Sequence, residues 1–325
     1  MKHISILVPT GDCSLANIEG THQILNRVND YLVDAGREPL FTIHLVGARP
    51  EVRMKNGLFT VSPDLLVHDL HHTDLILIPS VHGDKQKILA DNREILSWIV
   101  RQYQDGAAVA SMCIGAFLLA GTGLLDGKTC TTHWQLAEEF RRLFPAVNLV
   151  VDKIITEENN IYTSGGAYSW LNLILYLVEK YAGRQIAVQC AKGFQIDIQR
   201  TSQSPFIIFS GQKDHEDTAI RQAQDFIERN IHSRITVGQL ASRFALGRRN
   251  LERRFKKATG NTVMEYIQRV KMEVVKKSLE STRLGVNEAM DRVGYSDPKT
   301  FRIIFKKVTG LSPLQYRKRY NREFV

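Results

Sequence analysis

Cys113 is the residue whose setting in the sequence suggests covalent chemistry. It follows the apolar run Ala107–Met112 and precedes the apolar run Ile114–Leu119, so a buried strand is expected to turn into a helix there. A tight turn of this kind pushes one side chain out above the sheet, and the small Gly115 makes room for it. A helix N-terminus is expected to lower the pKa of this thiol, because amide N–H groups and the helix dipole favour the thiolate. His133 follows 20 positions later and could lie beside it.

The same residues also fit a purely structural interpretation. A free cysteine often behaves as a small buried hydrophobe, so Cys113 could serve only in packing. The spacing between Cys113 and His133 favours neither interpretation over the other. A nucleophilic thiol and a packing thiol therefore both stay open.

Metal chemistry has weaker support. His68, His71 and His72 stand near Asp69 and Asp74 in a polar connection, which we interpret as a solvated turn rather than a metal site. The four cysteines of the chain show no metal-type C-x-x-C spacing. We therefore predict no metal and no other cofactor.

A second chemical feature is a repeat near the end of the chain. The sequence FKKATG at 255–260 recurs as FKKVTG at 305–310, and the similarity extends to Leu251 with Phe301 and to Tyr266 with Tyr316. A self-similar unit of this length indicates a duplicated supersecondary structure.

Each copy has the pattern of a helix, a turn and a second helix. In the first copy Thr236 can cap a short helix, and the second helix is predicted over 248–259, ending at Gly260. In the second copy Asp297 can cap the second helix, with Pro298 at its first position. The second turn is one residue longer than the first.

The outward faces of the two second helices carry the residues expected to contact DNA. They are Arg248, Arg249, Asn250 and Arg253 in the first copy, and Asp297, Lys299, Thr300 and Arg302 in the second, where Asp297 also serves as a cap. Between the copies, Val263–Leu279 predicts a helix about 30 Å long, close to the ~34 Å between successive major-groove faces of B-DNA. The alternative is a generic helical bundle with solvated charges.

The charge of the chain supports a polyanion as the partner. Residues 215–325 hold 24 Lys and Arg against 12 Asp and Glu, whereas the whole chain has a net charge of only +9. The basic excess therefore belongs to the C-terminal region, as expected for a domain that binds nucleic acid.

Residues 219–320 resemble the C-terminal domain of AraC/XylS-type transcription regulators. The matching positions are Leu240, Ala241, Leu251, Arg253, Phe255 and Lys256, then Val293, Gly294, Tyr295, Asp297, Phe301, Phe305, Lys306, Lys307, Gly310, Ser312, Pro313, Tyr316 and Arg317. The resemblance implies two helix-turn-helix subdomains on one face of a DNA duplex, and a homodimer. One departure is Ile303, where the family often has Arg.

The elements that must position Cys113 alternate between strands and helices. Strands are predicted at Ile4–Val8, Phe41–Val46, Leu75–Ile78 and Ala107–Met112, and helices at about 15–35, 85–104 and 114–119 and after Gly165. A hairpin is predicted around Lys55-Asn56-Gly57. The predicted fold is α/β: a flavodoxin-like parallel sheet domain covered by helices on both faces, followed by an all-α domain with the two helix-turn-helix subdomains.

The segment from Ala110 to Trp134 resembles the ThiJ/PfpI superfamily, with its glutamine-amidotransferase-like fold. Together the two resemblances match the GlxA-type subfamily of AraC regulators. Enzymes of the superfamily place a His and a Glu beside the elbow cysteine, but here Asn17 aligns with the Glu and Glu19 follows two residues later. The loop 79–83, PSVHG, replaces the usual Pro-Gly-Gly.

These departures favour a non-catalytic domain that binds a small molecule. The residues predicted to bind it are Asn17, His82, Gly83, Cys113, Ile114 and His133, of which Cys113 and His133 would be a vestigial catalytic pair. The alternative is a retained cysteine-dependent amidase, hydrolase or glyoxalase-like activity.

The predicted domains are 1–197 for the α/β sensor, 198–218 for a linker and 219–325 for DNA binding. The apolar residues 206–209 inside the linker are expected to dock against a domain or a second subunit. No signal peptide and no membrane-spanning run are recognisable, so a cytoplasmic location is expected. The expected partners are double-stranded DNA, an unknown small-molecule effector, a second copy of the chain and RNA polymerase, as for an activator.

Overall fold

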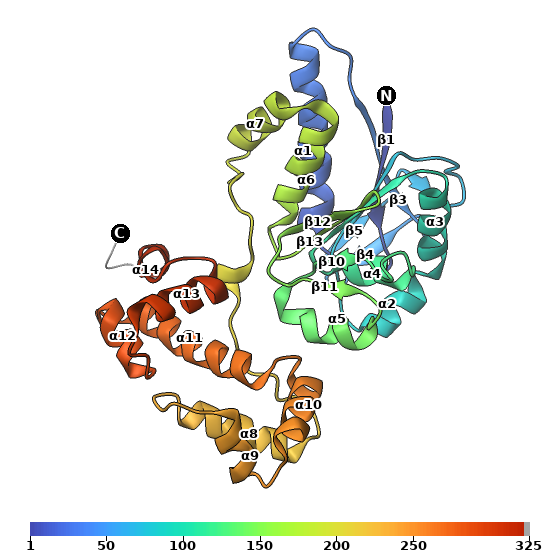
Figure 1. Cartoon of the computed structure of the whole chain (residues 1–325). Coiled ribbons are helices and arrows are strands. Elements are labelled where there is room, and N and C mark those ends of the chain that lie inside the picture. Colours follow the sequence, from blue (N-terminus) through green and yellow to red (C-terminus); the bar gives the residue numbers. More distant parts are fainter. Residues whose placement is uncertain (322–325) are drawn as a thin grey trace. The chain divides into compact units, whose positions relative to one another are not determined.

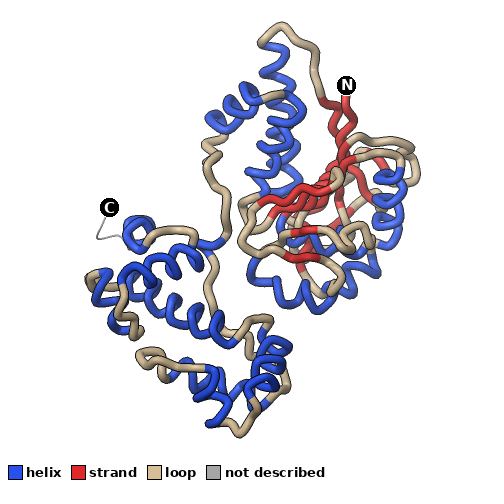
Figure 2. The backbone as a smooth tube through the Cα atoms, viewed as in Figure 1, coloured by secondary structure: helices blue, strands red, loops and turns tan. Residues whose placement is uncertain are grey.

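The computed structural model describes residues 1–321, and its contacts divide the chain into two compact units, Met1–Gln203 and Ser204–Val325. All described strands belong to the first unit, whereas the second consists of helices and loops (Figures 1 and 2). Among the described residues, none of the helices combines the length and the apolar character that a membrane span needs.

A seven-stranded sheet forms the centre of the first unit, with strand order β12-β13-β9-β7-β1-β3-β6. Its strands are β1 (Lys2–Val8), β3 (Phe41–Gly47), β6 (Leu65–Leu66), β7 (Leu75–Ile78), β9 (Ala108–Met112), β12 (Ile155–Glu158) and β13 (Ile161–Ser164). All neighbours run parallel except the edge pair β12–β13. Central strands such as β7 are buried along their whole length, which is why their sequences are continuously apolar.

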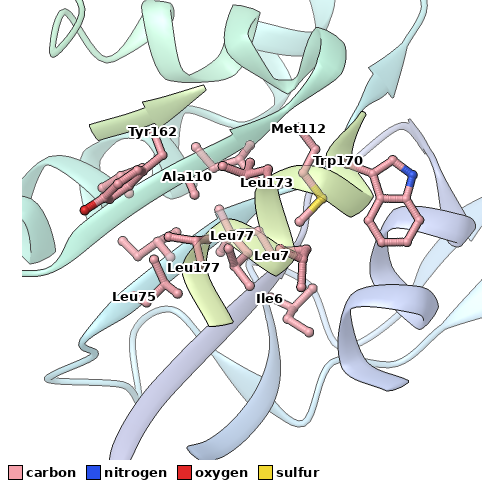
Figure 3. Packing of buried hydrophobic residues seen from close by; sticks show 14 of the residues in the cluster. Ile6, Leu7, Leu75, Leu77, Ala110, Met112, Tyr162, Trp170, Leu173 and Leu177 are labelled. Atoms are coloured by element: carbon pink, nitrogen blue, oxygen red, sulfur yellow. The ribbon is translucent and has the colours of Figure 1, made fainter. Parts of the chain in front are cut away.

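Helices cover both faces of this sheet (Figure 1). On one face lie α1 (Leu15–Asp34), α6 (Trp170–Ala182) and α7 (Arg184–Gly193); the other helices are α2 (Lys85–Asp91), α3 (Arg93–Gln104), α4 (Ala116–Gly121) and α5 (Ala137–Leu143). Figure 3 shows Leu173 and Leu177 of α6 close to Leu77 of β7, inside one continuous core. The predicted flavodoxin-like α/β fold is confirmed.

The prediction of one continuous helix over residues 85–104 is wrong. The structure breaks it at Asn92 into α2 and α3. The Asn92 side chain accepts a hydrogen bond from the Thr10 backbone N–H at 2.7 Å and donates to the Thr10 carbonyl at 2.8 Å. These two hydrogen bonds to the loop of Thr10 hold Asn92 outside either helix.

Three two-stranded sheets accompany the central sheet within the described residues. The predicted hairpin is confirmed: β4 (Val52–Met54) pairs with β5 (Phe59–Val61), and Lys55, Asn56 and Gly57 all have positive φ. The pairs β2 (Asp12–Cys13) with β8 (Val81–His82) and β10 (Thr129–Cys130) with β11 (Asn148–Leu149) were not predicted. Neither was the β12–β13 pair.

The second unit contains two helical clusters built around one long helix. Its helices are α8 (Thr218–Arg229), α9 (Val237–Arg243), α10 (Arg248–Thr259), α11 (Val263–Ser281), α12 (Val286–Arg292), α13 (Pro298–Thr309) and α14 (Pro313–Tyr320). Phe255 and Tyr266 lie in the core of the first cluster, and their repeat partners Phe305 and Tyr316 in that of the second. The duplicated sequence therefore encodes duplicated packing.

The predicted caps of these helices are confirmed. The Thr236 hydroxyl accepts from the Gln239 N–H at 3.2 Å at the start of α9. Both α10 and α13 end at a glycine in the left-handed region, Gly260 with φ 68° and Gly310 with φ 73°.

The segment predicted as a linker is not a free tether. Within the second unit, Lys276 of α11 donates to the Ile207 carbonyl at 2.6 Å, and the Phe209 ring lies 5.2 Å from the Tyr266 ring. The expected docking of residues 206–209 is thus confirmed, on the helical unit. The contact boundary falls between Gln203 and Ser204.

Candidate functional site

The elbow at Cys113 joins β9 to α4 through a single turn of 3-10 helix, η1 (Cys113–Gly115). Cys113 has φ 53°, a left-handed conformation that is uncommon for a residue with a side chain. A Cβ on Gly115 would lie 2.7 Å from the carbonyl oxygens of both Ile78 and Pro79, so only glycine fits against the end of β7. This close packing over-determines the strained elbow.

The elbow lies at the edge of the sheet where ligands usually bind in such folds. From β1 the chain continues to β3 on one side, and from β7 to β9 on the other, so the topology switches between β1 and β7. Asn17, after β1, spans this point: its Oδ1 accepts from the Ser80 N–H, after β7, at 3.0 Å. The Ser80 hydroxyl donates to the Met112 carbonyl at 3.0 Å. Asn17 therefore forms a hydrogen bond to the loop that follows β7, whereas the Glu of the enzymes would stand beside the cysteine.

Two further loops fix the Cys113 backbone. The Thr132 hydroxyl donates to the Cys113 carbonyl at 3.0 Å, and the Cys113 N–H donates to the Ser164 hydroxyl at 3.4 Å. The first contact brings the loop of His133 beside the elbow, as the sequence suggested. Thr132, Ser164 and Ser80 were not among the predicted site residues, because a hydroxyl in an unpatterned loop gives no sequence signal.

Burial dominates the environment of the Cys113 thiol. Burial raises its pKa, and this effect outweighs hydrogen bonds from Ser80 and the Ile114 backbone and the charge of Lys85. The predicted lowering of the pKa is therefore wrong, because Cys113 is only 5% exposed and burial disfavours the thiolate. No carboxylate acts on the thiol, and Glu19 is exposed.

His82 and His133 contribute two imidazoles to the proposed site. Burial and the charge of His82 lower the pKa of His133, whose ring stacks on Trp134 at 5.7 Å. Desolvation, Lys55 and Lys85 lower the pKa of His82. The pKa values of both imidazoles therefore lie below the ordinary 6.5.

Lys85 is a residue that the sequence did not single out. Its side chain is buried, its Nζ donates to the Gly83 carbonyl at 3.0 Å, and it lies 5.2 Å from the Phe117 ring centroid. Lys85 thus begins α2, two residues after Gly83 and three after His82 of β8. Residues 1–321 contain no group of three or more His, Cys, Asp or Glu side chains able to hold a metal ion.

The second candidate surface is the outward face of α10. Arg248, Arg249 and Arg253 are exposed there, and Asn250 is partly exposed. The Arg253 guanidinium donates to Asn250 Oδ1 at 3.1 Å, so these two side chains are held together. Leu251 and Phe255 are fully buried on the opposite face, which fixes the rotation of the helix.

The outward face of α13 differs from that of α10. Asp297 accepts from the Lys299 and Thr300 N–H groups at 3.1 and 3.0 Å, so it serves as the helix cap. Arg302 is exposed beside them, and Ile303 is 60% exposed. Ile303 occupies the place that Arg253 has in the first copy.

These two sites define a class of protein: a DNA-binding transcription regulator in which a helix-turn-helix pair is joined to a flavodoxin-like α/β domain. A model of the DJ-1/PfpI family matches residues 29–180, and a helix-turn-helix domain model matches residues 240–319. The chain thus combines a DJ-1/PfpI domain with a helix-turn-helix domain, and its relatives include HTH-type transcriptional regulators.

Relatives among known proteins span both units. The HTH-type transcriptional regulator CdhR of Pseudomonas aeruginosa is 24% identical over 285 residues, covering 86% of this chain and 82% of CdhR. The regulator GbdR of the same organism is 22% identical over 267 residues, covering 81% and 71%. The crystal structure of Drosophila melanogaster DJ-1beta shares the fold of the first unit, with a TM-score of 0.50 and 18% identity over 60% of this chain and 98% of DJ-1beta.

Proposed function

We propose that α10 and α13 read the DNA sequence, each from its outward face, and that α11 spaces them for successive major grooves of one duplex. The exposed basic residues on the outward faces of two duplicated helices carry this proposal. α11 has 19 residues, which at 1.5 Å per residue is about 28 Å, near the ~34 Å repeat of the groove.

The proposed contacts fall into two kinds. Arg249, Asn250 and Arg253 reach base edges from α10, and Lys299, Thr300 and Arg302 do so from α13. The remaining basic residues and the helix N-termini hold phosphates, which sets register without reading sequence. Arg248 and Asp297 have the roles of a phosphate contact and a cap.

The experiment is a selection of bound duplexes from a random pool with the full chain, followed by affinity measurements on the selected site. Arg249→Ala should weaken binding by about 1–3 kcal/mol and relax the preference at one base pair, if Arg249 makes a bidentate base contact. Arg37→Ala, at an exposed arginine of the α/β unit, is the control and should change neither. Unchanged affinity and preference for Arg249→Ala would remove that residue from the reading face.

For the first unit we propose a small-molecule sensor rather than an enzyme. The observation that carries this is the buried Cys113 thiol with a raised pKa and without a carboxylate partner, since a nucleophile needs an accessible thiolate. The proposed effector site comprises Asn17, His82, Gly83, Cys113, Ile114 and His133 at the carboxyl ends of β1, β7 and β9. Effector binding would change the occupancy of DNA, with the protein acting as a cytoplasmic homodimer that contacts RNA polymerase.

A cysteine-dependent activity is the second candidate, favoured by one observation. Cys113 holds a strained φ of 53° at the elbow, the backbone geometry in which nucleophiles are presented. Measuring the alkylation rate of Cys113 against pH separates the two functions. An apparent pKa at or above that of a free thiol supports the sensor, whereas fast stoichiometric modification with turnover of an amide or ester supports the enzyme.

A further inference from the structure

Lys85 is placed where a lysine is unfavourable unless something compensates its charge. Its residue is 6% exposed, although lysine is almost never fully buried without a partner. It is the first residue of α2, where the helix dipole disfavours a cation. None of the described residues forms an ion pair with Lys85; its ammonium donates to the Gly83 carbonyl and lies over the Phe117 ring.

The surroundings of Lys85 are part of the proposed effector site. α2 follows β8, which lies against the elbow turn η1, and Phe117 belongs to α4 directly after that turn. His82 of β8 stands three positions before Lys85. Asp12 of β2, the strand that pairs with β8, already has a cationic partner in Lys55 at 2.9 Å. The neighbouring Asp84 caps α2 by accepting from the Lys87 N–H at 2.7 Å.

We propose that Lys85 is the anion-binding residue of the effector site, and that the effector carries a carboxylate. An anion there would compensate a buried charge that the protein leaves unpaired, with His82 and His133 available as hydrogen-bond partners. A carboxylate fits better than a dianion because Lys85 supplies a single positive charge. This inference rests on the proposed sensor function of the same site.

The test uses Cys113 as a reporter inside the site and two reagents of nearly equal size. Iodoacetate is anionic and iodoacetamide is neutral; with either, the thiolate sulfur forms a bond to carbon, the carbon–iodine bond breaks and iodide leaves. The rate of each reaction at Cys113 is followed by peptide mass mapping of the full chain at alkaline pH. The ratio of the two rates cancels the thiolate fraction, so it reports only the preference for the negative charge.

We expect the ratio of iodoacetate to iodoacetamide rates at Cys113 to exceed that of a neutral cysteine peptide by about tenfold. Lys85→Met should return the ratio to that of the peptide, because methionine keeps the buried apolar stem without the charge. Lys85→Arg, the matched control, should keep a raised ratio. A wild-type ratio equal to or below that of the peptide would overturn the proposal without any variant.

A second measurement does not depend on the thiol. The pKa of His82, followed through its ring protons by NMR, should rise when sodium acetate replaces sodium chloride, and this response should vanish in Lys85→Met. Inorganic phosphate is the comparison arm, and a larger response to phosphate than to acetate would contradict the carboxylate. No response to either anion would overturn the anion site.

A separate experiment distinguishes failure of the proposed sensor function from failure of the anion site. The carboxymethylated full chain is compared with the unmodified chain for binding to the selected duplex. A raised rate ratio with unchanged DNA affinity would leave Lys85 as an anion site but reject its role in regulation. A changed DNA affinity with a rate ratio equal to that of the peptide would support regulation through this site but reject Lys85 as an anion site.

Discussion

The turn residues Ala245 and Gly294 occupy matched places in the two helix-turn-helix copies, and both have positive φ, 50° and 70°. A residue with a side chain is strained there, by about 1–2 kcal/mol for the left-handed region. Ala245→Gly should therefore stabilise the helical unit by up to ~1 kcal/mol, part of the relief being offset by unfolded-chain entropy. Thermal unfolding of the two proteins measures the difference.

Gly294→Ala is the reciprocal change and should destabilise. Its Cβ would lie 2.2 Å from the His232 carbonyl oxygen, a contact that side chains do not make. A loss of more than ~1 kcal/mol is expected from this contact together with the positive φ. A stabilising effect of this change, or a loss of stability for Ala245→Gly, would contradict the assigned turn geometry.

Ile303 offers a test of which face of α13 meets DNA. Because it is exposed at the position that matches Arg253, Ile303→Arg should add one cation to the proposed reading face. Affinity should rise at low salt, and the slope of log K against log salt should steepen by about one. Ile303→Gln is the uncharged control, and an unchanged slope in Ile303→Arg would place this face away from the phosphates.

At the residue scale, the sequence predicted where the caps and the elbow lie, but not the pKa of the elbow cysteine. The caps Thr236 and Asp297 and the elbow at Cys113 follow from local patterns of residue type, which is why they could be located. The raised pKa of Cys113 could not be predicted, because burial depends on the packing of β7 against the elbow. Lys85 was missed for the same reason, since an unpaired buried cation has no sequence signature.

Among the elements, the loops at the carboxyl ends of the strands are held together by Gln203. Its side chain is buried, and its Nε2 lies within hydrogen-bond distance of the Thr132, Val151 and Lys153 carbonyls at 3.0, 2.9 and 3.0 Å. Gln203→Ala should destabilise the α/β unit by about 1–3 kcal/mol, because the Thr132 and Val151 carbonyls would lose this donor, whereas the Lys153 carbonyl keeps the Thr131 hydroxyl. Urea unfolding measures this, with Gln199→Ala, at an exposed residue, as the control.

The junction of α8 and α10 predicts a dependence of stability on pH. Asp217 caps α8, and the Arg254 guanidinium holds the pKa of its carboxyl below the ordinary value. A carboxyl with a depressed folded pKa stabilises the fold above its unfolded pKa and loses this contribution as the pH falls through the folded value. The helical unit should thus lose stability on acidification below the ordinary carboxyl range, and Asp217→Asn should remove that part of the loss. If both proteins lost the same stability on acidification, groups other than Asp217 would be responsible.

Element boundaries were predictable where local signals set them. The ends of α10 and α13 follow from glycines in the left-handed region, and the bounds of the central strands follow from continuous apolar runs. The break at Asn92 could not be predicted, because it depends on hydrogen bonds to Thr10, 82 positions away. The docking of residues 206–209 was anticipated from their apolar character, but its target on α11 was not.

At the scale of the whole molecule, the hydrophobic cores separate cleanly. The cluster around the sheet ends before the junction, and the two helical clusters begin after it. Each unit therefore has the means to fold without the other. The basic excess belongs to the helical unit, so DNA binding should reside in it alone.

The fragment 204–325 should consequently unfold cooperatively and select the same duplex as the full chain, with a similar salt dependence. Because this fragment contains no cysteine, treatment with iodoacetate should leave its DNA affinity unchanged. The complementary α/β unit provides a sharper test of the boundary. A fragment 1–203 keeps Gln203 and its hydrogen bonds, whereas a fragment 1–197, cut at the boundary expected from composition, leaves the Thr132, Val151 and Lys153 carbonyls without that donor. The longer fragment should therefore be more stable in urea by about 1–3 kcal/mol. Equal stability of the two fragments would mean that residues 198–203 are a tether after all, and would remove the structural reason for placing the junction after Gln203.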